Sequence, residues 1–283
     1  TTLLVSLFTG FLIGLGSGIN VCVAHKLGLE DEEGARTTVC SSALISLIVG
    51  LIVGVICNLF AEPFLKLLGT KDELIDGAVL YLKIYSLGMP IMAIYNFGNG
   101  VLSAAGETKK PLFYLTIAGI LNVILNLFLV IALQLGVAGV AIATVISNVL
   151  SAGMVLTHLA RRNDDFAFRF RRMHIEKTPL LRILQIGIPA GIQGAIFSVS
   201  NVFIQSGINS FGENAIAGSS LALNFEYFTY DIANAFAQAA VTFTSQNYGA
   251  GDLRRCKKIF RYCMLFGVVF TEILSAVFMI WDD

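Results

Sequence analysis

Residues 39–61 read VCSSALISLIVGLIVGVICNLFA and contain no charged side chain. An α-helix rises about 1.5 Å per residue, so a run of this length crosses the roughly 30 Å hydrocarbon core of a bilayer. The run therefore predicts a transmembrane helix.

Seven further apolar runs have the same character, and they occupy residues 3–24, 79–104, 112–133, 137–159, 183–208, 214–245 and 259–281. The run at 214–245 is longer than a bilayer requires, so we expect part of it to protrude or kink. The sequence thus predicts an all-α membrane protein with eight transmembrane helices.

The composition supports this class. Hydrophobic residues make up 56% of the chain and charged residues only 13%, whereas a soluble domain is about 25% charged. Too little polar surface is left to cover a soluble globule, so we expect the lipid bilayer to surround the chain. The net charge is zero, which argues against a nucleic-acid partner.

The basic residues indicate the orientation, because cytoplasmic loops carry an excess of Lys and Arg. One set of loops holds Lys26, Arg36, Lys109, Lys110, Arg161, Arg162, Arg169, Arg171, Arg172, Lys177, Arg182, Arg254, Arg255, Lys257, Lys258 and Arg261. The other side holds Lys66, Lys71 and Lys83. The first set is therefore predicted to face the cytoplasm, as in a multi-pass protein of the inner (plasma) membrane.

The longest basic loop, 161–182, interleaves arginines with Phe166, Phe168 and Phe170. We interpret it as a cytoplasmic linker that lies on the anionic inner leaflet. Docking of a protein partner is the alternative.

An internal repeat relates two span ends that face the cytoplasm. When the segments 23–31 and 244–252 are aligned without gaps, Gly28 falls on Gly249 and Asp31 on Asp252. The offset covers six spans, so both copies run in the same direction, which is a transporter architecture. A six-helix unit implies twelve spans in all, and we expect this chain to be a piece of that longer protein.

Polar residues inside predicted spans nominate sites, because their burial in lipid is costly. Asn122 and Asn126 are spaced i, i+4 on one helix, and the next helix carries Thr144, Ser147 and Asn148. Amide and hydroxyl oxygens could bind a cation or relay protons. The alternative is that they hydrogen-bond between helices as packing contacts only.

Glu226 and Asp231 lie within the apolar run 214–245, among Tyr227, Phe228 and Tyr230. Carboxylates beside aromatic rings suit an organic cation, because charge attraction and cation–π contact act together. The alternative is that Glu226 faces a cavity without binding a ligand.

Two prolines interrupt the predicted spans. Pro90 follows Gly88, and Pro189 follows Gly187. Proline removes a backbone donor and kinks a helix, so both positions are candidate hinges.

Signals for catalysis are lacking in the sequence. There is no GxxxxGK[ST], HExxH or GxSxG motif. The five cysteines form no CxxC pair and the three histidines are scattered. We therefore expect no enzyme activity, no metal site and no cofactor.

Several segments together resemble the multidrug and toxic compound extrusion (MATE) family of prokaryotes. They are residues 95–111, which end in AAGETKKP, 121–126 (LNVILN), 136–144 (GVAGVAIAT), 186–191 (IGIPAG) and 246–252 (QNYGAGD). The resemblance implies a twelve-helix, two-lobe fold. By it, residues 1–160 hold five of six N-lobe helices and 183–283 hold three of six C-lobe helices.

The resemblance also carries site residues. One branch of the family uses Asn, Asp and Thr at the positions of Asn122, Asn126 and Thr144, so here an amide replaces the carboxylate. Another branch places a glutamate within the run 183–208, where this chain has Gln193, Ser198, Ser200 and Asn201.

The resulting hypothesis is a monomeric secondary active transporter that exports organic cations, including drugs, in exchange for H⁺ or Na⁺ by alternating access. Asn122, Asn126 and Thr144 would bind the coupling cation or proton, and Glu226, Tyr230 and Asp231 the substrate. The alternative within transport is a flippase for lipid-linked oligosaccharide precursors, which would favour a basic cavity. A non-transporting receptor or sensor is a third class.

Overall fold

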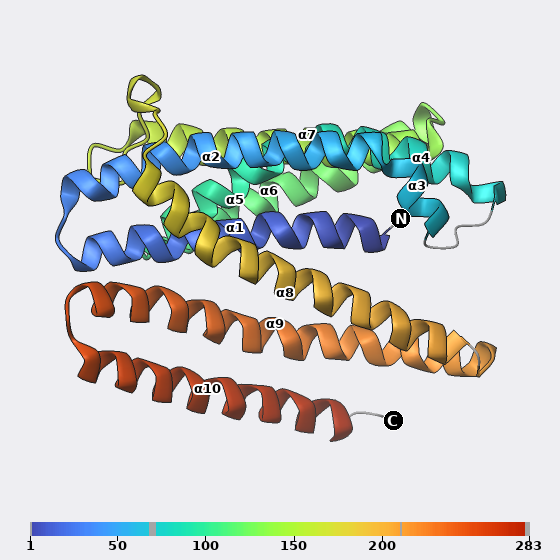
Figure 1. The fold of residues 1–283 in the computed structure, drawn as a ribbon. Helices are drawn as coiled ribbons and strands as arrows, with labels where there is room; N and C mark the ends of the chain where they lie inside the picture. Colours follow the sequence, from blue (N-terminus) through green and yellow to red (C-terminus); the bar gives the residue numbers. More distant parts are fainter. Residues whose placement is uncertain (1, 68–71, 210, 281–283) are drawn as a thin grey trace. The chain divides into compact units, whose positions relative to one another are not determined.

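The computed structural model describes residues 2–67, 72–209 and 211–280, and within these ranges it is helical without a strand (Figure 1). The α-helices are α1 (Thr2–Gly28), α2 (Glu32–Leu59), α3 (Ala61–Leu67), α4 (Asp72–Leu87), α5 (Met89–Ala104), α6 (Lys109–Asn126), α7 (Gly136–Arg161), α8 (Lys177–Asn209), α9 (Glu213–Gly249) and α10 (Leu253–Ile280). A π-helix, η1 (Leu127–Ala132), follows α6, and a 3-10 turn, η2 (Phe170–Arg172), precedes α8. The predicted all-α class is confirmed.

Six of the described helices are long and apolar enough to cross a membrane, namely α1, α2, α6 with η1, α7, α8 and α10. The pair α4 and α5 adds a seventh span when it is counted as one, and it is bent by 48°. The predicted run 79–104 is therefore two helices. Helix α9 contains the predicted run 214–245. Over its described residues, it is not among the helices that are long and apolar enough to cross a membrane.

The bend between α4 and α5 has a local cause. Gly88 separates the two helices, and Pro90 lies in the first turn of α5. A proline is tolerated there because the first N–H groups of a helix have no intrahelical acceptor. Pro189, in contrast, lies inside α8, and the helix continues past it. The hinge role of both prolines stays a prediction.

The chain forms two compact units, which are described separately. Unit 1 comprises Thr1–Val23 and Glu32–Ser198, and unit 2 comprises Ala24–Asp31 and Val199–Asp283. The boundaries fall within α1 and α8, so these units do not coincide with the lobes expected from the sequence. The predicted lobe limits therefore stay a prediction.

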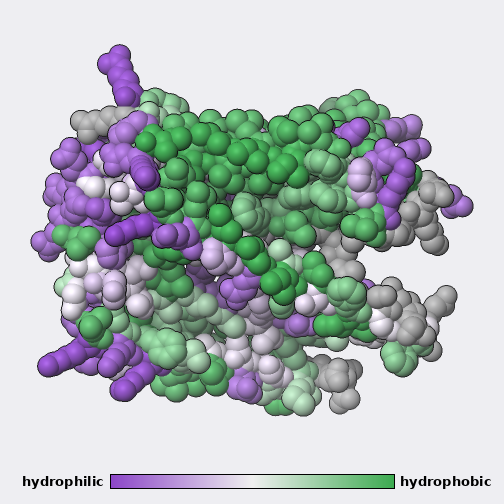
Figure 2. Space-filling view, in the orientation of Figure 1, coloured by the Kyte–Doolittle hydropathy of each residue, from purple (hydrophilic) through white to green (hydrophobic). Residues whose placement is uncertain are grey.

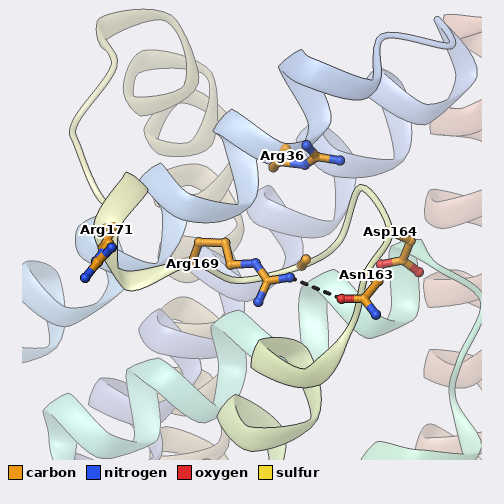
Figure 3. Close-up of a pocket in the computed structure, with 6 residues that line it drawn as sticks. Arg36, Asn163, Asp164, Arg169 and Arg171 are labelled. Atoms are coloured by element: carbon orange, nitrogen blue, oxygen red, sulfur yellow. Dashed lines mark hydrogen bonds between the residues drawn. The ribbon is translucent and has the colours of Figure 1, made fainter.

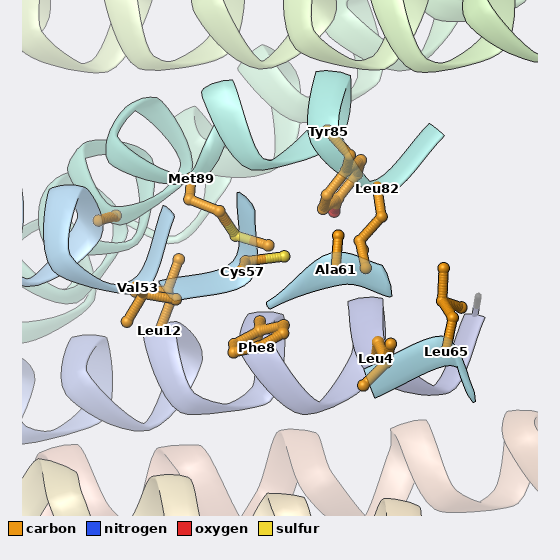
Figure 4. Packing of buried hydrophobic residues seen from close by; sticks show 11 residues of the cluster. Leu4, Phe8, Leu12, Val53, Cys57, Ala61, Leu65, Leu82, Tyr85 and Met89 are labelled. Carbon is orange, nitrogen blue, oxygen red and sulfur yellow. The ribbon is translucent and has the colours of Figure 1, made fainter. Parts of the chain in front are cut away.

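The core of unit 1 lies where α1 to α5 meet (Figure 4). Leu12 from α1, Cys57 from α2, Leu82 from α4 and Met89 from α5 are fully buried there. Helices α4, α5 and α6 also pack on α7. Helix α7 therefore lies beside α6, the helix that carries the two candidate asparagines.

The surface of unit 1 matches a membrane environment. Leu51, Ile52 and Val55 on α2 are about half exposed, which is expected for side chains that face lipid. Figure 2 shows apolar residues along the middle of α2 and hydrophilic residues gathered at the end where the segment between α7 and α8 lies. This distribution is expected of a helix that crosses a bilayer, and which end faces the cytoplasm stays a prediction.

Unit 2 contains the antiparallel pair α9 and α10. Ring contacts at 5.7 Å between Phe236 and Phe270 and at 4.6 Å between Phe225 and Phe278 define the register of the two helices. At the other end of α9, the two aligned glycines of the repeat meet. A Cβ atom on Gly28 would lie 1.8 Å from the carbonyl oxygen of Gln246, so only glycine allows this backbone approach.

Candidate functional site

The two asparagines of α6 form a connected pair. Asn126 donates a hydrogen bond from Nδ2 to Oδ1 of Asn122 over 2.9 Å, as the i, i+4 spacing allows. The Oδ1 atom of Asn126 is buried and has no hydrogen-bond donor among the described residues. A buried acceptor without a partner costs about 1–3 kcal/mol. The pair therefore presents an amide oxygen that a cation or a protonated group would stabilise.

The backbone around this oxygen is irregular. Asn126 is the last residue of α6, and the π-helix η1 begins at Leu127. Single π turns inside helices are rare and frequently occur at functional sites. The candidate site thus coincides with a local departure from α-helical geometry.

Thr144 lies on α7, which packs against α6. Its hydroxyl group donates to the carbonyl oxygen of Val140 over 3.0 Å. Among the hydrogen bonds of the described residues, none joins Thr144 to Asn122 or Asn126. The structure therefore brings together the two asparagines, while the participation of Thr144 stays a prediction.

The donor set can be compared with the needs of a cation. Two amide groups supply oxygen ligands of the kind that hard cations prefer, but no negative charge. Within the described residues, no group of three or more His, Cys, Asp or Glu side chains could hold a metal ion. The pair therefore suits a weakly held monovalent cation or a proton relay better than a tight divalent metal site.

The three predicted substrate residues of α9 are only partly grouped. Glu226 and Tyr230 are spaced i, i+4 and share one face of the helix, whereas Asp231 follows about 100° further round. All three are exposed within unit 2. The structure thus places Glu226 beside Tyr230 along one face and separates Asp231 from them.

A groove of about 540 Å³ runs between α9 and α10. Its lining is apolar and includes Phe236, Val241, Phe260 and Met264. None of the three predicted substrate residues lines it. The groove instead begins at Ala233 and extends toward the end of α9, so it adds apolar contact surface next to the acidic segment.

Glu272 is a further carboxylate that the sequence interpretation left out. It lies within the long apolar run of α10. The contacts of Phe270 with Phe236 and of Phe278 with Phe225 place Glu272 and Asp231 at similar depths along the helix pair. The sequence alone could have identified Glu272, because a single acidic residue within a long apolar run is costly in a membrane.

A polar cluster joins the ends of α5, α6 and α7 on the side predicted to be cytoplasmic. Glu107 accepts from Arg162 Nη1 at 2.6 Å and contacts His158 Nε2 at 3.2 Å. Lys110 Nζ lies 3.9 Å from the same carboxylate. Partial burial alone would raise the pKa of Glu107, but the hydrogen bond and charge of Arg162, with His158 and Lys110, hold it below its usual value.

The sequence matches one known protein family and individual known proteins. The sequence profile of the MatE family matches residues 1–128 and 189–283. The probable multidrug resistance protein YoeA of Bacillus subtilis (strain 168) is 27% identical over 281 residues, which cover 97% of this chain and 60% of YoeA. A FAD transporter of Shewanella oneidensis is 25% identical over 95% of this chain and 60% of that protein. The chain therefore spans about 60% of the length of these relatives.

Solved structures show the same fold. An outward-facing multidrug resistance MATE family transporter of the MOP superfamily superposes with a TM-score of 0.88 at 23% identity. The match covers 98% of this chain and 62% of that one. At this identity the likeness concerns the arrangement of the helices.

Proposed function

Because the chain belongs to the MatE family, we propose that its protein is a secondary active transporter, not an enzyme, that exports organic cations in exchange for H⁺ or Na⁺. It would act as a monomer in the plasma membrane. The observation that carries this proposal is the buried, donor-free oxygen of Asn126 beside Asn122 within a membrane-spanning helix. The name of the relative YoeA, a probable multidrug resistance protein, supports the drug class.

The coupling step would use the asparagine pair. Asn126 Oδ1 would bind a cation, or accept a hydrogen bond from a proton shared with an acidic group. Either interaction would remove the free-energy cost of the unpaired acceptor. Thr144 would supply a hydroxyl oxygen from α7. Because both amides are neutral, the site would hold the ion loosely enough to release it in each cycle.

The substrate step would use the acidic segment of α9. Glu226 and Asp231 would attract a cationic substrate, and Tyr230 would offer the face of its ring. The apolar groove between α9 and α10 would contact the hydrophobic part of the same molecule. Glu272, at similar depth on α10, would add to the negative potential.

Alternating access requires two states that the ion and the substrate stabilise differently. The bend of 48° at Gly88 supplies a place where α4 and α5 could change their angle. The close approach of Gly28 to Gln246 would form in one of these states and break in the other. Ion binding would favour one state and substrate binding the other.

Specific observations bear on two other candidate cargoes. The relative from Shewanella oneidensis is described as a FAD transporter, and a lipid-linked oligosaccharide precursor is the flippase alternative. Both cargoes are anionic and would favour basic residues within the spans. The described helices carry acids in the predicted spans of α9 and α10, and Lys83 in α4 lies near the end predicted to face outward. This charge pattern favours a cationic substrate.

The proposal is tested with the full-length protein in proteoliposomes. Export of a fluorescent organic cation is measured beside export of FAD under an imposed ion gradient. Export of the cation alone supports the proposal. Export of FAD alone contradicts the proposal and favours FAD as the cargo. Export of neither compound by folded protein also contradicts it and favours the lipid-linked precursor.

A further inference from the structure

The segment between α7 and α8, residues 162–176, is folded onto unit 1, and we call it the basic cap. Phe168 is 2% exposed, its ring lies 6.1 Å from that of Phe97, and its N–H donates to Leu159 O over 3.1 Å. Ser41 Oγ of α2 donates to the carbonyl oxygen of His174 over 2.8 Å. The basic cap is therefore anchored on α2, α5 and α7 and is not a loose tether.

A cleft of about 320 Å³ opens between the basic cap and the first turns of α2. Its lining residues are Arg36, Asn163, Asp164, Ala167, Arg169 and Arg171. Figure 3 shows the side chains of Arg36 and Arg169 extending toward the side of Asn163 and Asp164, with Arg171 at the opposite end. Arginines from two distant parts of the sequence thus share one cleft.

The cleft has an excess of positive charge. The two nearby carboxylates are already paired, Asp164 with Arg162 at 2.9 Å and Asp165 with Arg36 at 3.2 Å. The hydrogen bond from Arg162 holds the pKa of Asp164 below its usual value, so this group stays ionised. Arg162 is shared with a third carboxylate, Glu107, at 2.6 Å. Arg169 and Arg171 have no carboxylate partner among the described residues, so the cleft keeps unpaired positive charge that an anion would balance.

Two of the three arginines that line the cleft, Arg169 and Arg36, are held in place. Arg169 donates to Ala160 O at 3.2 Å, to Arg162 O at 3.1 Å and to Asn163 Oδ1 at 3.3 Å. These bonds fix the guanidinium while leaving its Nε–H without a partner among the described residues. The Nε of Arg36 is likewise buried without one. A planar guanidinium with remaining N–H donors matches the geometry of a phosphate group.

The position of the cleft indicates where the phosphate comes from. Arg36 lies one turn after the start of α2 at Glu32, and no charged residue follows it in that helix. Phe170, between Arg169 and Arg171, is 69% exposed. Exposed aromatic side chains among basic residues are typical of segments that lie at the lipid interface. The cleft is therefore within one or two turns of the predicted headgroup region.

We propose that this cleft binds the phosphate group of an anionic phospholipid of the cytoplasmic leaflet. Arg36 and Arg169 would bind the phosphate oxygens, Arg171 would add positive charge at the other end of the cleft, and Phe170 would contact the upper part of the acyl chains. The site would anchor the basic cap, and with it the ends of α2, α5 and α7, to the inner leaflet. It does not depend on which cargo the protein transports.

The test uses native mass spectrometry of the full-length protein extracted with a mixture of phosphatidylglycerol and phosphatidylcholine. The double variant Arg36→Gln/Arg171→Gln is compared with the matched control Arg254→Gln/Arg255→Gln, which removes two arginines of the same predicted cytoplasmic side from α10. We expect retained phosphatidylglycerol to fall by about fivefold per arginine in the first variant. The control should stay near the wild-type value, and phosphatidylcholine retention should be low in all cases.

Three outcomes would overturn the proposal. Equal losses in both double variants would indicate general surface attraction without a site. Displacement of phosphatidylglycerol by millimolar inorganic phosphate would assign the cleft to a soluble anion. Unchanged retention in Arg171→Gln alone would also contradict it. That single variant guards against misfolding, because Arg171 has no hydrogen bond or ion pair among the described residues, whereas Arg36 pairs with Asp165.

Discussion

Asn126 donates a hydrogen bond to Asn122 over 2.9 Å, while its own Oδ1 is buried without a donor among the described residues. This hydrogen bond fixes the orientation of the Asn126 amide group. The orientation leaves an acceptor atom where α6 changes into the π-helix η1. This arrangement is costly as a packing contact and useful as a cation or proton site.

The asparagine pair is tested by Asn122→Ala and Asn126→Ala. Each change removes one oxygen, and a hydrogen bond or contact to a charged group contributes about 1.5–3 kcal/mol. We expect the apparent affinity for the coupling ion to fall about tenfold or more. The measurement is the dependence of the melting temperature on Na⁺, with K⁺ holding the ionic strength constant, and on pH.

Thr116→Ala is the control on the same helix, because Thr116 bonds only to the carbonyl oxygen of Leu112 within the described structure. Asn126→Asp should act in the opposite direction and strengthen ion binding, since it adds a negative charge. An unchanged response to both ions in Asn126→Ala would show that the pair is a packing contact.

The acidic segment of α9 is tested by Glu226→Gln combined with Asp231→Asn. We expect lower efflux of organic cations at unchanged expression, because the attraction for positive charge is removed while size is kept. The matched control is Glu73→Gln with Asp76→Asn on α4, which removes two carboxylates far from the proposed site in the sequence. Equal efflux in the wild type and in the α9 variant would remove these residues from the substrate site.

The contact between Gly28 and Gln246 is tested by Gly28→Ala. The added Cβ would lie 1.8 Å from a backbone oxygen, so the helices must separate. Overpacking of this kind costs about 1–3 kcal/mol. We expect a lower melting temperature and slower transport.

Gly119→Ala on α6 is the control, because an added Cβ there meets no atom within 4 Å. It should keep or slightly raise the melting temperature, since alanine favours helix. A melting temperature of Gly28→Ala equal to that of this control would contradict the close approach.

The Glu107 cluster predicts that the stability of the protein decreases at low pH. The pKa values of Glu107 and Asp164 lie below their usual values in the folded protein, chiefly through contacts with Arg162. Their contribution to stability is therefore complete above the ordinary carboxyl pKa of about 4 and is lost as the pH falls through the lower folded value. We expect the melting temperature to decrease from about pH 5 downward.

The variant Arg162→Gln distinguishes the contribution of this cluster to the acid dependence from that of other acidic groups. It removes the one partner that both carboxylates share, so its melting temperature should be lower at pH 7 and should change less between pH 5 and pH 3. A decrease as steep as that of the wild type would mean that other groups cause the acid dependence.

Much of the fold could be predicted because membrane spans are long and nearly free of charge. The run 39–61 corresponds to most of α2, and the Gly88-to-Pro90 signal marks the place where the predicted span 79–104 bends. The alignment of Gly28 with Gly249 identified positions that meet within unit 2. These features depend on composition and on backbone sterics, which a single sequence shows directly.

Other features depend on tertiary contacts that leave no local signal. The sequence predicted that 161–182 is a linker on the inner leaflet, which stays a prediction, but it did not indicate that Phe168 would be buried against Phe97. The i, i+4 spacing predicted that Asn122 and Asn126 share a face, but the π-helix at Leu127 has no distinctive residues. Whether Thr144 reaches the pair depends on the rotation of α7, which periodicity alone does not determine.

The most direct test of ion-coupled cation export is efflux from proteoliposomes that contain the full-length protein, with proton and sodium gradients imposed separately. The account predicts export of a fluorescent organic cation under at least one gradient, and a loss of that gradient dependence in Asn126→Ala. Export that is absent under both gradients, from protein shown to be folded, would contradict it.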